Sequence, residues 1–112
     1  MTPAEHPRRG DLWWVAFDPP LGGEIRKMRP AVVVSNDFAN RALNRVQVVP
    51  ITSNVGRLYP SEAYVTVAGE RRKAMADQLA TVSRLRLPER IGRVGAAEMT
   101  DIARAITIQL QL

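Results

Sequence analysis

The stretch Gly22-Gly23-Glu24-Ile25-Arg26-Lys27-Met28-Arg29-Pro30 lies between two runs, residues 12–17 and 31–35, that both have the composition of β-strands. Two glycines give the start of the stretch conformational freedom, whereas Pro30 favours an extended backbone at the residue before it. We therefore predict a basic loop that ends by placing Arg29 at the entrance of a strand. A hydrophobic core does not require such a loop, which makes it a candidate functional segment.

Further short strands are predicted at residues 46–52, 64–67, 75–82 and 90–94, and a brief helix from Asn36 or Asp37 to about residue 43. Pro50 interrupts the strand at 46–52 and predicts an edge strand or a bulge there. Thr52, Ser53 and Asn54 then leave the strand end as three hydrogen-bonding side chains in a row.

A helical period begins at Gly95. One apolar stripe is formed by Met99, Ile102, Ile106 and Leu110, and a second by Ala105, Ile108 and Leu112. The first stripe is predicted to cover a barrel and the second to form a homodimer contact. The alternative is a helix buried more deeply in its own monomer.

These elements predict a mainly β (α+β) fold, a small and strongly bent sheet or barrel. Residues 1–8, with His6, are predicted to be a flexible N-terminal tail, and residues 9–112 a single domain.

The composition of the 112-residue chain excludes several classes of protein. Without cysteine it has no disulfide, and no apolar run is long enough to cross a bilayer. The N-terminus does not have the plan of a secretory signal, so we expect a cytoplasmic protein that does not bind a membrane. Sixteen basic residues against eleven acidic ones give a net charge of +5. An anionic partner, nucleic acid or acidic protein, is one explanation; a soluble surface with a basic bias is the other.

The order of these motifs resembles a known family. Residues 9–19, Arg-Gly-Asp-Leu-Trp-Trp-Val-Ala-Phe-Asp-Pro, resemble the opening strand of the MazF/PemK toxins. Gly23-Glu24 with Arg29-Pro30-Ala31-Val32-Val33-Val34-Ser35 resembles their active loop and second strand, and Val49-Pro50-Ile51-Thr52-Ser53 their third. Ala76-Asp77-Gln78 and Ile91-Gly92-Arg93-Val94 resemble the later part. The resemblance extends from about residue 9 to the C-terminus.

The resemblance implies a Src-homology-3-like barrel (CcdB/PemK-like) with a short helix after the second strand and a C-terminal helix, forming a homodimer. It implies the toxin of a type II toxin–antitoxin system, a metal-independent endoribonuclease (mRNA interferase). Such an enzyme cleaves single-stranded RNA at short sequences, with messenger RNA as substrate and ribosomal and transfer RNA as further candidates, and leaves 2′,3′-cyclic phosphate and 5′-hydroxyl ends. A cognate antitoxin with a disordered acidic segment normally occupies the RNA groove.

By the same resemblance, Arg29 and Thr52 match the family's catalytic arginine and threonine, and Glu24 its loop glutamate. The family's loop is commonly Gly-Ser-Glu-Gln, whereas this chain has Gly22-Gly23-Glu24-Ile25. A hydroxyl and an amide are missing from the loop, which bears on the cleavage sequence more than on the chemistry.

Cleavage of RNA to a cyclic phosphate requires loss of the 2′-hydroxyl proton, stabilisation of phosphoryl charge and protonation of the leaving oxygen. His6 is the only histidine, so a two-histidine mechanism is excluded, and the scattered acids predict no metal site and no cofactor. Arg29 is the candidate for gripping the phosphate, with Thr52 as a second donor. Glu24 is the candidate base; its alternative role is positioning of the loop.

Further candidates for RNA binding are polar and mostly basic: Arg26, Lys27, Ser53, Asn54, Gln78, Arg84 and Arg86. For Gln78 the alternative is a structural hydrogen bond, and for Arg84 and Arg86 a solvated rim. Trp13 and Trp14 point to opposite faces of their strand, so one belongs to the core and the other stacks on a base or fills a dimer contact.

Two other functions remain open on the same barrel. One is a non-catalytic, CcdB-like toxin that binds gyrase, and the other is a module that binds an acidic peptide. Pairing of Arg29 with Thr52 favours the ribonuclease, because a protein-binding poison has no need of a phosphate clamp.

Overall fold

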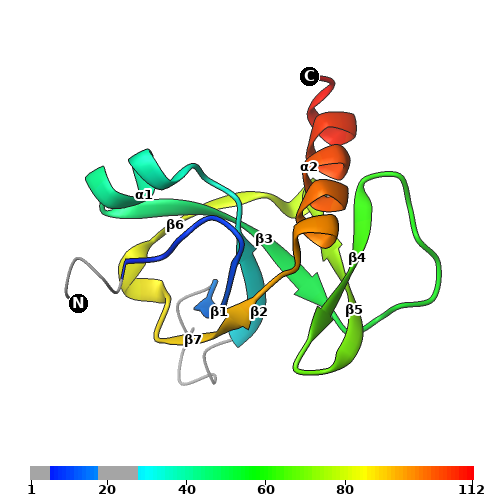
Figure 1. The fold of residues 1–112 in the computed structure, drawn as a ribbon, viewed down its shortest axis with the longest axis horizontal. Coiled ribbons are helices and arrows are strands. Elements are labelled where there is room, and N and C mark those ends of the chain that lie inside the picture. The colour runs from blue at the N-terminus through cyan, green and yellow to red at the C-terminus, as the bar shows by residue number, and fades with distance from the viewer. Residues whose placement is uncertain (1–5, 18–27) are drawn as a thin grey trace, which may run out of the picture.

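Strand β3 (Arg45–Thr52) runs through the middle of a curled antiparallel sheet (Figure 1). The structure, a computed structural model, describes residues 6–17 and 28–112. The strand order is β4-β5-β3-β2-β1-β7, and β6 pairs with β3 as well. In chain order the elements are β1 (Asp11–Ala16), β2 (Met28–Val33), α1 (Asp37–Ala42), β3, β4 (Glu62–Val67), β5 (Glu70–Met75), the 3-10 helix η2 (Ala76–Gln78), β6 (Ala80–Ser83), the 3-10 helix η3 (Arg84–Arg86), β7 (Glu89–Arg93) and α2 (Ala96–Leu110). The predicted mainly β fold with a short helix after the second strand and a C-terminal helix is confirmed.

β3 changes its partner along one side at Pro50. The first part of β3 pairs with β6 as far as Val48, and its end pairs with β5 from Ile51 onward. Pro50 lies between these two pairings and, on its other side, opposite Ala31 of β2. Since proline has no N–H to donate, it is tolerated where a side of the strand has no ladder partner. The predicted edge strand is therefore wrong: β3 has neighbours on both sides, and the proline marks the exchange of one neighbour for another.

The predicted strand at 75–82 is also wrong, because η2 interrupts it. β5 and β6 both run antiparallel to β3 and lie end to end along it. Met75 ends β5, η2 takes up three residues beside the Pro50 region of β3, and β6 then starts at Ala80. No strand is predicted at 70–74, because Glu70-Arg71-Arg72-Lys73 is a charged run without apolar alternation.

Both faces of the sheet carry buried apolar side chains. Along β1, Leu12 belongs to one apolar cluster and Trp13 to the other. In β2, likewise, Val32 belongs to the first cluster and Val33 to the second, so this apolar strand is covered on both sides. The first cluster also takes in Ile102 and Ala105 of α2.

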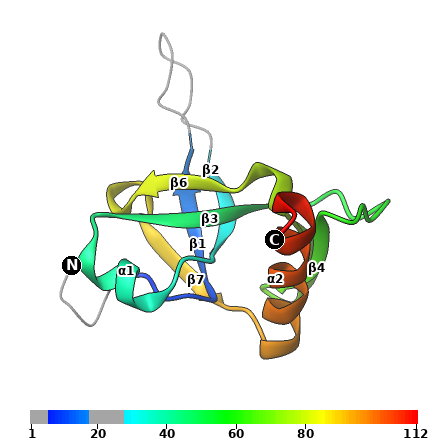
Figure 2. The ribbon, with the colours of Figure 1, turned by 90° about the horizontal axis from the view of Figure 1, so that it is seen from above.

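α2 covers the sheet near β4, and the two elements lie side by side in both views (Figures 1 and 2). Ile102 and Ala105 are buried, and Met99 and Ile106 pack against the first cluster. The predicted division into two stripes is wrong at two positions: Ala105 belongs to the protein's own core, and Leu110 is 50 % exposed. Together with Ile108 and Leu112, Leu110 forms an exposed apolar end of the helix.

The segment before β1 is held against the domain. His6 and Pro7 are buried, so the predicted tail does not extend to these residues, while residues 1–5 lie outside the described part of the chain. The Arg9 guanidinium donates to the Val34 carbonyl, and the Arg9 backbone N–H donates to Asp37 Oδ1 over 2.7 Å. This backbone hydrogen bond holds the pKa of the Asp37 carboxyl below its ordinary value. At Gly10, where φ is +93°, a side chain would be strained.

The turn between β4 and β5 carries local backbone strain. Val67 pairs with Glu70, so Ala68 and Gly69 form a two-residue turn, and their φ values are +51° and +81°. Such turns favour Asn-Gly, because an alanine in the left-handed region costs about 1–2 kcal/mol.

We expect Ala68→Asn to raise the free energy of unfolding by about 1 kcal/mol, since asparagine adopts this backbone conformation more readily than alanine. Urea denaturation measures the change. Ala97→Asn, an exposed position in α2, is the control and should give no gain. A loss of stability in Ala68→Asn would contradict the assignment of strain to this turn.

Candidate functional site

A cleft of about 540 Å³ opens where β2 begins and β3 ends. Three parts of the sheet line it. Strands β1, β2 and β7 contribute Trp14, Arg29, Pro30 and Ile91; the end of β3 contributes Ile51, Thr52 and Ser53; and the β4–β5 hairpin contributes Val67, Ala68, Glu70 and Arg72. The cleft thus combines an aromatic ring, two guanidinium groups and two hydroxyls.

Arg29 and Thr52 come from neighbouring strands and line this same cleft. The ladder between β2 and β3 ends at Ala31 opposite Pro50. Continuing that register by two residues places Arg29 opposite Thr52, because antiparallel partners advance in opposite directions. The structure therefore brings together the two residues that the sequence predicted to act as a pair.

The Thr52 hydroxyl is oriented by the turn that follows it. Its Oγ1 accepts a hydrogen bond of 3.2 Å from the backbone N–H of Asn54. Since a hydroxyl is both donor and acceptor, this bond leaves its proton for a ligand. Thr52 is half-buried, which limits the rotation available to that donor.

A buried ion pair supports the loop after β3, which carries Ser53 and Asn54. Lys73 of β5 is 4 % exposed, and its Nζ donates to Glu62 Oε1 at 3.0 Å and to the Arg57 carbonyl at 2.5 Å. Glu62 also accepts from the Tyr59 backbone N–H at 2.9 Å. One ammonium group therefore ties both the middle of the segment, at Arg57, and the start of β4, at Glu62, to β5.

The remaining predicted RNA-binding residues are divided between the cleft, the protein surface and the undescribed segment. Ser53 lines the cleft, and Asn54 is exposed beside it, with its Oδ1 accepting from the Gly56 N–H. Glu24, Arg26 and Lys27 lie outside the described residues.

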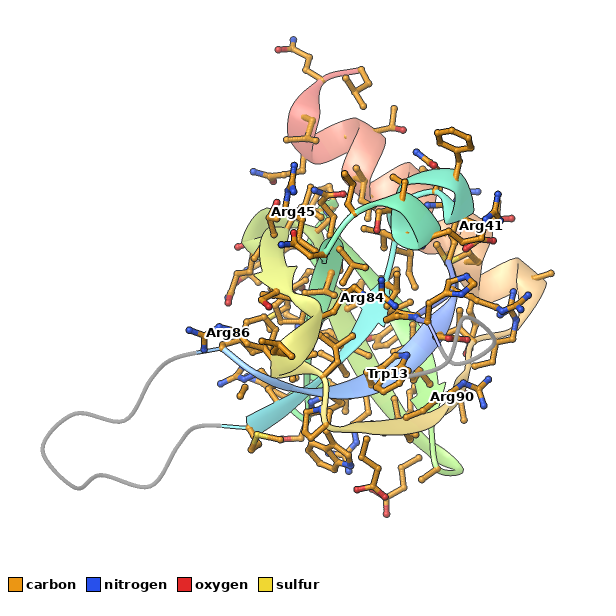
Figure 3. The ribbon with its side chains drawn as sticks, turned by 90° about the vertical axis from the view of Figure 1, so that its left-hand side faces the viewer. Trp13, Arg41, Arg45, Arg84, Arg86 and Arg90 are labelled. Atoms are coloured by element: carbon orange, nitrogen blue, oxygen red, sulfur yellow. The ribbon has the colours of Figure 1, made fainter. Side chains whose placement is uncertain are left out.

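Gln78, Arg84 and Arg86 do not line the cleft. Gln78 Nε2 contacts Met75 Sδ over 3.6 Å, the structural alternative that the sequence left open. Arg84 donates to the Leu43 carbonyl, and Arg86 donates to the Ala16 carbonyl over 2.9 Å at the end of β1 (Figure 3). Both arginines thus bind backbone carbonyls outside the cleft, and their role in RNA binding stays a prediction.

A second group of arginines is fixed by a buried carboxylate. Asp11 is 3 % exposed; its Oδ1 accepts from Arg93 at 3.2 Å and from Arg90 at 3.4 Å, both on β7. Its Oδ2 accepts from the Trp13 indole and from the Arg8 backbone N–H. Trp13 is therefore the core tryptophan, its ring directed into the protein in Figure 3.

Trp14, Glu70 and Arg72 complete the cleft and were not selected as site residues from the sequence. Trp14 is the tryptophan that is exposed, at 38 %. Because side chains alternate along a strand, the sequence predicted that Trp13 and Trp14 lie on opposite faces of β1. It did not predict which of the two faces the rest of the protein covers. Glu70 and Arg72 lie in β5, which the sequence did not predict, so no signal pointed to their position.

Within residues 6–17 and 28–112, no group of three or more histidine or acidic side chains is arranged to hold a metal ion. In that same part of the chain, no helix is long and apolar enough to span a membrane.

The sequence and the fold were compared with those of known proteins, and both comparisons point to one family of toxins. Residues 8–110 match the model of the PemK-like, MazF-like toxins of type II toxin–antitoxin systems. Endoribonuclease MazF9 of Mycobacterium tuberculosis is 41 % identical, over 94 % of this chain and 97 % of its own length. The endoribonuclease toxin MazF of Escherichia coli K12 is 36 % identical, over 91 % and 92 % of the two chains. Among solved structures, an endoribonuclease in complex with its cognate antitoxin from a mycobacterial species superposes with a TM-score of 0.78 at 26 % identity, covering 95 % of this chain and 96 % of that one.

This chain belongs to the PemK-like, MazF-like toxin family. The resemblance seen in the sequence is confirmed. Of the residues that carried it, Asp18, Pro19, Gly23 and Glu24 lie outside the described residues, and the others lie in or next to β1, β2, β3, η2 and β7.

Removing the buried ammonium should destabilise the fold strongly. We expect Lys73→Met to lower the free energy of unfolding by about 3–5 kcal/mol, because Glu62 would be left as a buried charge without its partner. Chemical denaturation measures the loss. The double variant Lys73→Met/Glu62→Leu should regain much of it, whereas equal losses in the single and double variants would show that the ion pair is not the cause.

Proposed function

We propose that this toxin is a metal-independent endoribonuclease that cleaves single-stranded RNA in the Arg29/Thr52 cleft, with messenger RNA as its main substrate. The observation that carries the proposal is that Arg29 and Thr52, from two neighbouring strands, line the same cleft. The endoribonuclease activity named for the 41 % and 36 % identical relatives supports it.

The proposed reaction is an attack of the ribose 2′-oxygen on the adjacent phosphorus. The new O–P bond closes a 2′,3′-cyclic phosphate as the bond to the 5′-oxygen breaks, and that oxygen takes up a proton from solvent water and leaves as a 5′-hydroxyl. Glu24 accepts the 2′-proton. The developing negative charge falls on the non-bridging oxygens, which Arg29 binds with its fork of donors and Thr52 with its hydroxyl.

The rest of the cleft suits an unpaired RNA strand. The exposed face of Trp14 offers a stacking surface for a base, which is available only when the base is not in a duplex. Ser53 and Asn54 offer hydrogen bonds for base edges at the end of β3. Arg26 and Lys27, in the segment before Arg29, add phosphate contacts.

The partners we propose are a cognate antitoxin and a second copy of the chain. An acidic, disordered antitoxin segment would compete with RNA for the arginines of the cleft, in line with the antitoxin complex solved for a relative. The apolar C-terminal end of α2 supports a homodimer. The cytoplasm, where messenger RNA is translated, is the proposed site of action.

Arg29→Ala and Thr52→Ala should each slow cleavage of a long RNA in EDTA on the order of a hundredfold, because each removes one donor to the phosphoryl charge. Gel analysis of the products measures the rate, and circular dichroism confirms that the variants fold. Arg104→Ala, an exposed arginine on α2 outside the cleft, is the matched control and should cleave normally. Intact RNA with the unmodified toxin would contradict the proposal and favour a gyrase-binding or peptide-binding function. Unchanged cleavage by Arg29→Ala would show that Arg29 does not act in the reaction.

Ile108→Glu should convert the dimer to a monomer, because it places a charge in the apolar end of α2 that we propose as the subunit contact. Light scattering measures the mass. Gln109→Glu adds the same charge at the next exposed position and should stay dimeric. An unchanged mass in Ile108→Glu would remove this surface from the dimer.

A further inference from the structure

We propose that Arg72 binds a second phosphate of the RNA strand, next to the one held by Arg29, and that Glu70 holds the Arg72 guanidinium in the cleft until RNA displaces it. This inference rests on the proposed function, since it assigns a role at the same cleft to residues outside the cleavage step.

The topology places two arginines on opposite sides of one strand end. β3 lies between β2 and β5, and continuing its register with β5 beyond Thr52 opposite Lys73 places Arg72 opposite Ser53. Arg29 is on β2, on the other side. The backbones of β2 and β5 are therefore two strand spacings apart, roughly 10 Å. Side chains of this length that lean toward the strand between them can reach adjacent phosphates of one chain.

Arg72 is directed to the cleft, whereas its neighbour is not. Lys73 points inward to Glu62 and the Arg57 carbonyl, and Arg72 lines the cleft with its side chain 32 % exposed. Arg72 is thus a cation in the cleft that pairs with Glu70, another cleft residue.

The Glu70–Arg72 pair has the properties of a replaceable contact. Arg72 Nη2 lies 2.7 Å from Glu70 Oε2, and the Glu70 side chain is 70 % exposed. An ion pair this exposed adds little stability, because water screens both charges. A phosphate offers the guanidinium a comparable set of oxygens, and the displaced carboxylate returns to water. Glu70 therefore keeps Arg72 extended into the cleft at a small cost to RNA binding.

The two residues should act on RNA affinity in opposite directions. The test uses fluorescence anisotropy with a short, labelled, mixed-sequence single-stranded DNA, which carries the phosphates but lacks the 2′-oxygen and so is not cleaved. Arg72→Gln should weaken binding roughly tenfold at low salt and reduce the slope of log affinity against log salt by about 0.7, the loss of one phosphate contact. Glu70→Gln should tighten binding severalfold. Arg72→Lys, which keeps the charge, should retain most of the salt slope.

The Asp101–Arg104 pair on α2 provides the matched control, since it is also an exposed ion pair and lies outside the cleft. Arg104→Gln and Asp101→Asn should change the affinity less than twofold, the effect of net charge alone. Equal effects of Arg72→Gln and Arg104→Gln, or weaker binding by Glu70→Gln, would overturn the inference.

Cleavage assays separate this inference from the proposed function. With long RNA in EDTA, Arg72→Gln should raise KM and leave kcat nearly unchanged, whereas Arg29→Ala lowers kcat. If the unmodified toxin does not cleave RNA, the proposed function fails, and the DNA-binding series still decides whether Arg72 holds a phosphate. If cleavage depends on Arg29 but KM and DNA binding do not respond to Arg72, only the further inference fails.

Discussion

The change of partner along β3 is the constraint on which the cleft depends. Pro50 has no N–H for a ladder on one side, and η2 occupies the corresponding gap between β5 and β6. β5 can therefore approach the end of β3 while β6 covers its beginning. This arrangement places Thr52 between strands that carry Arg29 on one side and Arg72 on the other.

A buried ion pair helps to position the polar groups around the end of β3. Lys73 and Glu62 form an ion pair with side-chain exposures of 5 % and 11 %, and the ammonium also binds the Arg57 carbonyl. The segment that follows Thr52 and carries Ser53 and Asn54 is thus anchored to β5 by buried contacts. A polar network of this kind rigidifies a site when all its groups are satisfied, and no buried side-chain nitrogen or oxygen among the described residues lacks a partner.

Much of the arginine content has a structural use. Arg9, Arg84 and Arg86 donate to backbone carbonyls, and Arg90 and Arg93 neutralise the buried Asp11. A guanidinium suits both tasks, because its several donors reach a carbonyl or carboxylate while its stem packs against apolar surface. The high net positive charge is therefore a weaker sign of RNA binding than the two arginines that line the cleft, Arg29 and Arg72.

Local sequence determined most of the elements of this toxin, because strand composition, a helix cap and the period of α2 act over neighbouring residues. It also determined that Arg29 begins one strand and Thr52 ends another, and the order of its motifs was enough to indicate the family. Tertiary structure alone decided that Trp14 is the exposed tryptophan, since both faces of β1 look alike until the rest of the chain packs on them. It alone made a strand of the charged run at 70–73, where pairing with β3 and β4 and the burial of one lysine outweigh a composition unfavourable to strands. The pairing of β5 with β3 also places Arg72 at the cleft. This pairing is a long-range contact that the residues around Arg72 do not predict.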